Sequence, residues 1–353
     1  MTISPAEPEI SLADTKPADP TSSEALFQLL FGKHITYSLS AVARLGVADY
    51  MSATPASIDT LAAATGAHAR SLYRVMRMLA GVGVFSESAG KQFSLTAIGE
   101  HLKTRAPGSL RHLAICFGDK WSTRGFENLT HSVCTGEDGV TKAYGKNTFE
   151  VLADYSEAAD TFHRAMLNVS SMVSDALLAS YDFFGISRMA DIGGGHGGLL
   201  ASVMRHYPQM QGVLFDLPEV VAGAYDAGHL SGLENRVQIE AGSFFERVPA
   251  GCDAYLLKHI LHDWSDNHCH RILRLIREQL PGGARVLVCE LIVPDEPGPA
   301  PAKALDIEML ALTVGGRERT LSEFHELFKS AGLRLERVVR TTTAFCVLEV
   351  RRD

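Results

Sequence analysis

The sequence lacks the marks of a secreted or membrane-spanning protein. Its six cysteines stand far apart at irregular intervals, and no two form a Cys-x-x-Cys pair. That pattern is typical of reduced intracellular thiols and argues against a disulfide framework. The chain does not open on a basic segment followed by an apolar run, and it has no stretch of about 18 apolar residues that would span a membrane. We therefore expect a cytoplasmic location and no membrane partner.

The sequence also lacks the positive charge of a typical nucleic-acid-binding protein. It holds 33 Lys and Arg against 41 Asp and Glu, which gives a formal net charge of -8. Because a negative field repels phosphate groups, we expect no nucleic acid as the main partner. What the chain does have is length and apolar content. Its 353 residues, 46% of them hydrophobic, suffice for two domains with a large core.

The pattern along the chain predicts a tail and three structured regions. Residues 1–22 are rich in Pro, Ser, Thr, Asp and Glu, which predicts a disordered tail. Residues 23–111 read as helix, turn, helix and two short strands, a winged-helix pattern. Residues 112–180 are helical apart from one long glycine-marked loop at 136–145. Residues 181–353 alternate strands with helices, which predicts a mostly parallel sheet with helices on both faces.

A glycine-rich loop follows the first strand of this last region, in the segment Asp191-Ile-Gly-Gly-Gly-His-Gly-Gly198. In a doubly wound sheet the ligand lies beyond the carboxyl ends of the strands. Glycines let the backbone approach that ligand, and the following helix offers free N–H groups. Asp216 ends the second strand, where a carboxylate can accept both hydroxyls of a ribose. Because Gly193-x-Gly195-x-x-Gly198 also satisfies the dinucleotide fingerprint, a nicotinamide dehydrogenase remains a rival at this point.

Three further motifs follow the glycine loop in a fixed order. They are Phe215-Asp-Leu-Pro218, His262-Asp-Trp-Ser-Asp266 and Gly315-Gly-Arg-Glu-Arg-Thr320. The succession resembles the metal-independent small-molecule O-methyltransferases, which include plant caffeic-acid-type and bacterial polyketide-tailoring enzymes, and it covers the chain from about Ser23. Dehydrogenases do not carry the last two motifs. The resemblance implies a Rossmann-like doubly wound methyltransferase sheet at 181–353. It also implies an N-terminal all-helical winged-helix domain, with the two short strands as its wing, that forms a homodimer.

The resemblance implies S-adenosylmethionine as the cofactor, S-adenosylhomocysteine as its product, and no metal. Gly193 would lie against the cofactor, Asp216 would bind the ribose, and Lys258 would lie near the adenine. The full set expected to bind the cofactor is Asp191, Gly193, Gly195, Asp216, Leu217, Gly242, Ser243, Phe244 and Lys258. The family often has Asp where this chain has Ser243, which can exchange one hydrogen bond but lacks the charge. Phe244 can still pack on the base.

Methyl transfer to a hydroxyl needs a group that takes the proton. A phenol, with a pKa near 10, is mostly protonated at neutral pH, and a histidine is a suitable general base. His259 and His262 are both candidates, and the resemblance implies His262, with His259 as a packing or hydrogen-bonding residue. It also implies that Asp263 contacts the acceptor. Glu290 and Glu318 would flank the base, and one of them would fix the tautomer of the imidazole.

A metal site is an alternative for this histidine-rich region. Its possible ligands are His259, His262, His268, His270, Asp263 and Asp266. Their spacing matches no zinc signature, so we expect no metal. We expect His268 and His270 to lie in the exposed first turn of the following helix.

The helices at 112–180 are expected to cover the acceptor site. The resemblance implies an apolar slot for a flat ring made by Trp121, Phe162, Met166, Met309 and Leu312. Such residues at helical spacing are more often simply core. The expected substrate is a small hydroxylated aromatic natural product such as a polyketide, methylated on a phenolic oxygen.

Two alternatives remain open from the sequence. The same fold also serves C- and N-methyltransferases, hydroxylases and decarboxylases, although the presence of His262 favours methyl transfer. A more distant alternative is a DNA-binding regulator, in which Arg70, Arg74 and Arg77 of the winged helix would contact phosphates. The negative net charge argues against that alternative.

Overall fold

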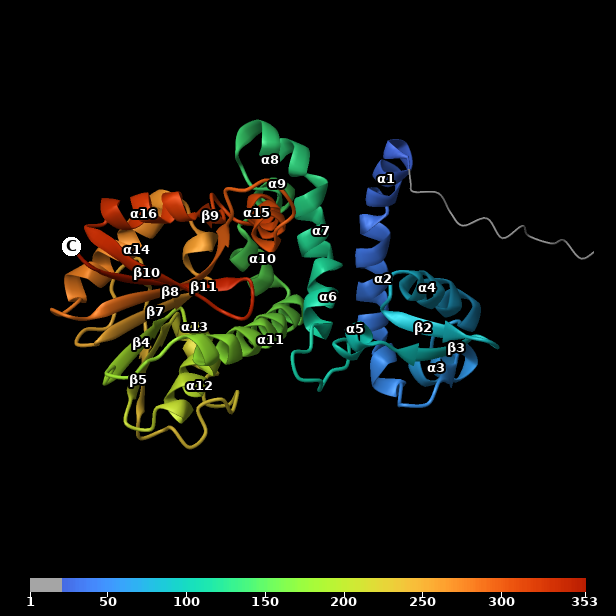
Figure 1. Ribbon diagram of the computed structural model, residues 1–353, viewed down its shortest axis with the longest axis horizontal. Coiled ribbons are helices and arrows are strands. Elements are labelled where there is room, and N and C mark those ends of the chain that lie inside the picture. The colour runs from blue at the N-terminus through green and yellow to red at the C-terminus, as the bar shows by residue number, and fades with distance from the viewer. Residues whose placement is uncertain (1–20) are drawn as a thin grey trace, which may run out of the picture.

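The computed structural model describes residues 21–353, so nearly all of the tail expected at 1–22 lies outside the described residues. A small N-terminal lobe and a larger lobe built on a sheet lie at opposite ends of the molecule, with a column of helices between them (Figure 1). In the described part of the chain no helix combines the length and the apolar character needed to cross a membrane. All six cysteines are free thiols.

The N-terminal lobe has the winged-helix arrangement that the sequence predicts. A three-stranded sheet in the order β1-β3-β2 forms the wing. The core between helices and wing includes Leu61, Met76, Leu79 and Phe93, each almost fully buried. The elements are α1 (Ser22–Leu29), α2 (Gly32–Leu45), η1 (Val47–Tyr50), β1 (Ala56–Ser57), α3 (Ile58–Thr65), α4 (Ala69–Gly81), β2 (Phe85–Ser88), β3 (Gln92–Leu95) and α5 (Ala97–Glu100).

Six helices connect the two lobes. They are α6 (Arg111–Phe117), α7 (Lys120–Glu127), α8 (Leu129–Thr135), α9 (Gly139–Tyr144), α10 (Thr148–Asp154) and α11 (Ser156–Ser180). The single long loop expected at 136–145 is wrong, because it contains α9. Asp138 caps that helix by accepting the backbone N–H of Thr141 at 2.7 Å. Gly136 and Gly145 take left-handed conformations at the ends of α8 and α9, so these glycines end helices and do not mark a continuous loop.

The large sheet confirms the predicted doubly wound α/β class. Its strand order is β10-β11-β8-β7-β4-β5-β6. The five strands from β8 to β6 are parallel, and β11 and β10 are antiparallel at one edge. The strands are β4 (Arg188–Ile192), β5 (Gln211–Asp216), β6 (Val237–Ala241), β7 (Ala254–Lys258), β8 (Arg285–Val293), β10 (Leu333–Arg340) and β11 (Phe345–Arg352), and β9 (Arg319–Thr320) pairs with β8.

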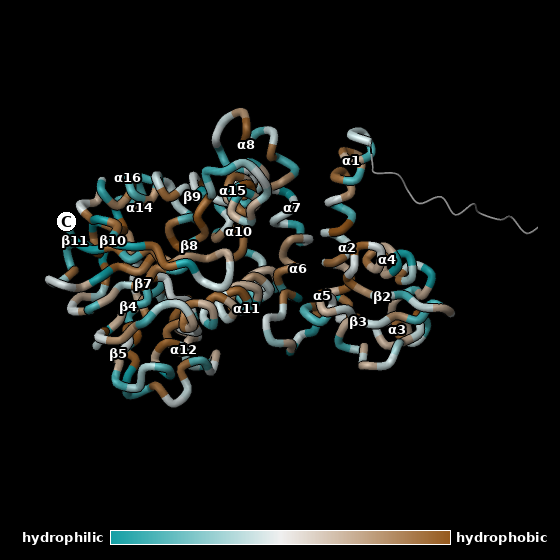
Figure 2. The backbone as a smooth tube through the Cα atoms, viewed as in Figure 1, coloured by the Kyte–Doolittle hydropathy of each residue, from teal (hydrophilic) through white to brown (hydrophobic). Residues whose placement is uncertain are grey.

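Helices cover both faces of this sheet because alternate residues of each strand point to opposite faces. On β7, Tyr255 and Leu257 belong to the apolar core beneath α14 and α16, whereas Leu256 belongs to the core beneath α11 and α12. Figure 2 shows hydrophobic residues along these central strands. The helices after β4 are α12 (Gly198–His206), α13 (Pro218–Val221), η2 (Leu261–Asp263), α14 (Asp266–Gln279), α15 (Pro301–Leu312) and α16 (Leu321–Ser330).

The strand order places the functional segments at one point of the sheet. β4 and β7 are neighbours, but the chain runs outward in opposite directions from them, to β5 on one side and to β8 on the other. Loops leaving the carboxyl ends of such a strand pair diverge and leave a crevice between them. The glycine loop follows β4 and the segment that contains His262 follows β7, so the two segments face each other there.

Candidate active site

The glycine loop contains positions that only glycine can occupy without backbone strain. Gly193, Gly195 and Gly197 have φ angles of 70°, 60° and 80°, a region that other residues seldom adopt. A Cβ on Gly193 would also stand 2.4 Å from Cδ1 of Ile260, in the segment after β7. A Cβ on Gly195 would meet nothing within 4 Å, so that side of the loop is open to a ligand. The loop thus packs tightly on one side and leaves space on the other.

Asp216 lies beside this loop, as the sequence predicts. One carboxylate oxygen accepts the backbone N–H of Gly195 at 2.8 Å, and the other accepts that of Leu217 at 2.7 Å. Burial raises the pKa of Asp216, and the two N–H donors oppose that rise. Each oxygen keeps further acceptor capacity, because a carboxylate offers about four lone-pair sites. The carboxylate is therefore held in one orientation and can still accept ribose hydroxyls.

Aromatic rings form the wall opposite the loop. A Cβ on Gly193 would lie 3.6 Å from Cε1 of Phe244, so this ring borders the glycine loop. Phe244 also meets the ring of Trp264 edge-on, with centroids 6.1 Å apart. The Ser243 hydroxyl accepts the backbone N–H of Phe245 at 3.3 Å. The N–H of Gly242 is bonded to the carbonyl of Asp216 at 2.9 Å, which holds the β5 and β6 ends together.

Lys258 and Asp191 lie at the floor of the crevice. Burial lowers the pKa of Lys258, and the Asp191 and Glu290 carboxyls oppose that change. Burial raises the pKa of Asp191 to about 7, with Lys258 acting against the rise. The ammonium of Lys258 is thus set among carboxyl groups, and its contact with adenine stays a prediction.

His262 and Glu318 are brought together although 56 residues separate them in the chain. Nδ1 of His262 lies 2.7 Å from Oε1 of Glu318. Since an ionised carboxylate only accepts, Nδ1 carries a proton in this pair, and the lone pair of the neutral ring is on Nε2. Nε2 lies 3.5 Å from the carboxylate of Asp263. The ring is 7% exposed, so this geometry is held away from bulk water.

Glu290 also faces the His262 ring and binds the backbone beside it. Its Oε1 accepts the backbone N–H groups of Ile260 and Leu261, at 3.1 and 3.0 Å, and its Oε2 lies 3.8 Å from Nδ1 of His262. These bonds stabilise the turn after His259, whose own φ of 55° is unusual for a residue with a side chain. The His259 ring stacks on that of His262 at 4.9 Å, which matches the packing role expected for it.

The charges around His262 decide its protonation. Burial alone would lower its pKa, but the facing carboxyls of Glu290, Asp263 and Glu318 outweigh burial and raise the pKa to about 10. Burial raises the pKa of Glu290 to about 7, against the attraction of the imidazolium. The surroundings therefore favour the protonated ring, which is the form that results when a base has taken a proton.

The Gly315–Thr320 segment contains positioning residues that the sequence did not single out. Its backbone reaches the catalytic turn directly, because the N–H of Arg317 donates to the carbonyl of His262 at 2.8 Å. Arg319 is fully buried, and its guanidinium donates to the carbonyls of Leu261 at 2.8 Å and Trp264 at 3.0 Å. The same group binds the Asp266 carboxylate at 2.7 Å. The two arginines flanking Glu318 in this motif were the only sequence signal that could have predicted these positioning residues.

The apolar residues expected to bind the acceptor lie partly together. Trp121, Leu312 and Phe162 belong to one cluster, in which the rings of Trp121 and Phe162 meet edge-on at 5.9 Å. Met309 is buried one turn before Leu312 on α15, a helix that the sequence reading missed. Met166 is half-buried on α11, one turn after Phe162. Nε1 of Trp121 is buried without a hydrogen-bond partner in the described structure.

Comparison with known proteins agrees with this geometry. The O-methyltransferase domain family matches residues 126–334, and the O-methyltransferase dimerisation domain family matches residues 27–105. The phenazine O-methyltransferase of Lysobacter antibioticus is 37% identical over 93% of this chain and 96% of its own length. The mitomycin biosynthesis 6-O-methyltransferase of Streptomyces lavendulae is 36% identical over 90% of each chain.

One similar solved structure contains bound ligands. It is that of an O-methyltransferase from neocarzinostatin biosynthesis in complex with S-adenosylmethionine and 2-hydroxy-5-methyl naphthoic acid. Its TM-score is 0.78 at 30% identity, covering 95% of this chain and 100% of that one. The fold and the crevice define a methyltransferase that uses S-adenosylmethionine. The chain belongs to the O-methyltransferase family with an N-terminal dimerisation domain.

Proposed function

We propose that this enzyme methylates a phenolic hydroxyl of an aromatic natural product, with His262 as the general base. The observation that carries the proposal is the 2.7 Å contact between Nδ1 of His262 and buried Glu318. This contact supports a proton on Nδ1, which leaves Nε2 as the acceptor of the neutral ring. Among the relatives named above, one is a phenazine O-methyltransferase and another was solved with 2-hydroxy-5-methyl naphthoic acid, so both names point to aromatic compounds.

In this proposal His262 takes the proton and three carboxylates surround it. Bound S-adenosylmethionine supplies an electrophilic methyl group together with its own leaving group. Nε2 of His262 takes the proton of the acceptor hydroxyl as the oxygen becomes a nucleophile. Glu318 and Glu290 stabilise the imidazolium that results, because both carboxyls face the ring. Asp263, 3.5 Å from Nε2, accepts a hydrogen bond from the acceptor or a neighbouring hydroxyl.

The crevice residues fit the cofactor. Asp216 would accept the ribose hydroxyls, and the open side of Gly195 would admit the cofactor beside the loop. Phe244 would pack on the adenine, with Ser243 offering one hydrogen bond at that end. The acceptor would lie against Trp121, Phe162, Met166, Met309 and Leu312, between the connecting helices and α15.

The protein also has a surface suited to a second copy of itself. Leu26, Leu29 and Leu30 at the end of α1 are 60%, 77% and 65% exposed in the single chain. Apolar side chains gathered in this way normally mark an interface. Because they lie in the dimerisation domain, we propose that α1 and α2 of two chains pack together in a homodimer.

The His262, Glu290 and Glu318 side chains also satisfy the simplest geometric requirement for a cation site, with ligand atoms within 4.8 Å of one another. In the hydrogen-bonded arrangement Oε1 of each glutamate is already engaged, whereas Oε2 of each is buried without a hydrogen-bond partner in the described structure. Glu290 accepts two backbone N–H groups, and Glu318 faces a protonated ring nitrogen. We propose that the two glutamates hold the imidazole. Activity that survives exhaustive treatment with EDTA would agree, and activity lost with EDTA and restored by Mg²⁺ or Zn²⁺ would contradict it.

The role of His262 is tested by replacing it with alanine. We expect turnover to fall by about 10²–10⁴ while the affinity for S-adenosylhomocysteine, measured by calorimetry, stays within about twofold. His325→Ala is the matched control, because that ring is exposed on α16. The activity assay would use a panel of hydroxylated aromatic acceptors, with products identified by mass spectrometry and NMR. Unchanged turnover in His262→Ala would remove it as the base.

A further inference from the structure

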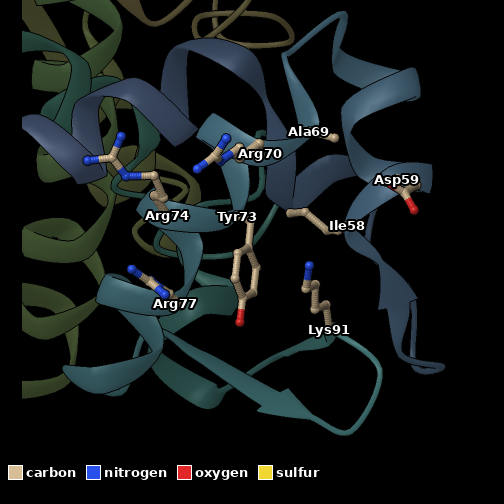
Figure 3. A pocket seen from close by; sticks show the side chains of 8 residues that line it. All are labelled: Ile58, Asp59, Ala69, Arg70, Tyr73, Arg74, Arg77 and Lys91. Atoms are coloured by element: carbon tan, nitrogen blue, oxygen red, sulfur yellow. The ribbon is translucent and has the colours of Figure 1, made fainter.

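A basic hollow lies on the winged-helix domain, at the end of the molecule away from the large sheet (Figures 1 and 3). Its volume is about 630 Å³, within the range of small-molecule sites. Its wall includes Arg70, Arg74, Arg77 and Lys91, with Tyr73 between them and one acid, Asp59. Four cations around one hollow stand out in a chain whose net charge is -8.

These four cations have no ion-pair partner among residues 21–353. Arg70, Arg74 and Arg77 follow one another at spacings of four and three on α4, so they share one face of the helix. Like charges at this spacing destabilise a helix, and no acidic residue in the first turn of α4 offsets them. The arrangement therefore leaves repulsion between like charges along this face of α4.

Tyr73 holds two of the cations in place. Nζ of Lys91 lies 4.8 Å from the centroid of its ring, and the guanidinium of Arg77 lies 5.5 Å from it. The electron-rich ring attracts both charges and offsets part of their mutual repulsion. Lys91 comes from the tip of the wing between β2 and β3, so the ring ties the wing to α4. The positive charges are thus gathered before any ligand arrives.

We propose that this hollow binds a small molecule that carries a pyrophosphate-type group. Arginine forks and a lysine ammonium are the groups that bind phosphate oxygens best. Ala69, at the start of α4, also lines the hollow, and His68 makes no side-chain capping bond there. The positive end of the helix therefore adds to the same field.

Double-stranded nucleic acid fits the hollow less well. A duplex backbone would pass Asp59 on the far wall, and it would approach a chain with an excess of eight negative charges. The local charge is favourable only within residues 22–105, where eight Lys and Arg face five Asp and Glu. The exposed apolar residues of α1 do not line the hollow, so the proposed dimer surface leaves it a separate site.

Titration calorimetry with sodium pyrophosphate tests the proposal. The full chain would be saturated with S-adenosylhomocysteine first, so that the crevice of the sheet is filled. We expect binding at about 0.15 M salt that weakens by about tenfold or more in the Arg74→Gln, Arg77→Gln double variant, because two charge-assisted contacts are lost. The matched control is Arg271→Gln, Arg274→Gln, which removes the same charge from two exposed positions on α14. It should bind pyrophosphate as the wild type does.

Three outcomes would overturn the proposal. The first is no binding of pyrophosphate by the wild-type chain at millimolar concentration. The second is equal loss of affinity in the α4 variant and in the α14 control, which would show a general charge effect. The third is binding of a fluorescent DNA duplex that the α4 variant loses and that pyrophosphate does not displace, which would assign the surface to nucleic acid. A circular-dichroism spectrum and a thermal unfolding midpoint equal to those of the wild type would show that both variants are folded.

Discussion

At the scale of single residues, the protonation of His262 links the structure to a measurable pH dependence. The facing carboxyls raise its pKa to about 10 although burial opposes them. If the neutral ring is the base, the rate of the wild-type enzyme should increase with pH through the neutral range and above it. Glu318→Gln removes one of the charges that raise the pKa, so the rising limb should move to lower pH. The maximal rate should fall by about tenfold or more, because the imidazolium loses its closest partner.

The measurement is kcat against pH for both proteins, with the affinity for S-adenosylhomocysteine as a check on folding. Glu326→Gln is the matched control, since it makes the same change at an exposed position of α16. A rising limb that stays in place or moves to higher pH in Glu318→Gln would contradict the proposed charge effect.

The candidate catalytic residues could be named from the sequence because they lie in short motifs, and the structure places His262, Asp263, Glu290 and Glu318 together. His262 and Asp263 are adjacent in the chain, and Glu318 lies in the Gly315–Thr320 motif. The division of labour between Glu290 and Glu318 was not predictable, since it depends on which carboxylate reaches Nδ1 in three dimensions. The structure brings Glu318 to 2.7 Å and directs Glu290 to two backbone N–H groups.

At the scale of elements, buried Arg319 holds the turn that contains His262 in place. It joins β9 to the carbonyls of Leu261 and Trp264, on either side of His262. Arg319→Met should lower the free energy of unfolding by about 2–4 kcal/mol, because both carbonyls lose a buried donor. It should also lower kcat more than it changes the affinity for the cofactor product.

Urea unfolding and steady-state kinetics measure the two effects. The control is Arg317→Met, whose side chain is 40% exposed and pairs with Asp266 and Glu323 near the surface. Exposed ion pairs contribute little, so this control should lose less than about 1 kcal/mol. Equal destabilisation in both variants would show that burial of Arg319 has no special role.

The glycine loop gives a second prediction at this scale. Gly193→Ala combines a left-handed backbone with a contact of 2.4 Å to Ile260. The loop would have to move away from the segment after β7, so we expect the affinity for S-adenosylhomocysteine to fall by about tenfold or more. Gly185→Ala is the control, because Gly185 has a φ of 83° with nothing within 4 Å of the added Cβ. Calorimetry that finds the Gly193→Ala affinity equal to that of Gly185→Ala and of the wild type would contradict the prediction.

Elements with a regular pattern were predicted well, and those stabilised by distant contacts were not. The strands β4 to β8 have apolar runs long enough to be recognised from the sequence, and α16 has the predicted capping box at Thr320 and Glu323. α15 and α9 were missed. α9 has only six residues and is recognisable mainly from its cap. α15 contains Asp306, Glu308 and small residues among its apolar ones, so its periodicity is weak, and it packs against α7 and α9 far away in the chain.

At the scale of the whole molecule, helix α1 presents an apolar surface that a single chain does not bury. α1 belongs to the winged-helix lobe, yet it has no buried residue of its own. The sequence places Leu26, Leu29 and Leu30 close together on this segment without showing what would cover them. The apolar side chains of α1 add to stability only when a second chain buries them. The match to a dimerisation domain indicates that this second chain is another copy of the protein.

The assembly prediction follows from that exposed face. Leu30→Glu places a charge in the apolar surface formed by Leu26, Leu29 and Leu30, where a partner chain would have to desolvate it. We expect light scattering after size exclusion to give a mass near twice 38.2 kDa for the wild type and near 38.2 kDa for the variant. Phe184→Glu is the matched control, because Phe184 is 82% exposed on the other lobe. A wild-type chain that elutes as a monomer at micromolar concentration would contradict the dimer. A variant that keeps the dimer would move the interface away from α1.

If the dimer also closes the acceptor site, Leu30→Glu should raise KM for the aromatic acceptor and leave the affinity for S-adenosylhomocysteine unchanged, because the cofactor crevice is built entirely from the larger lobe.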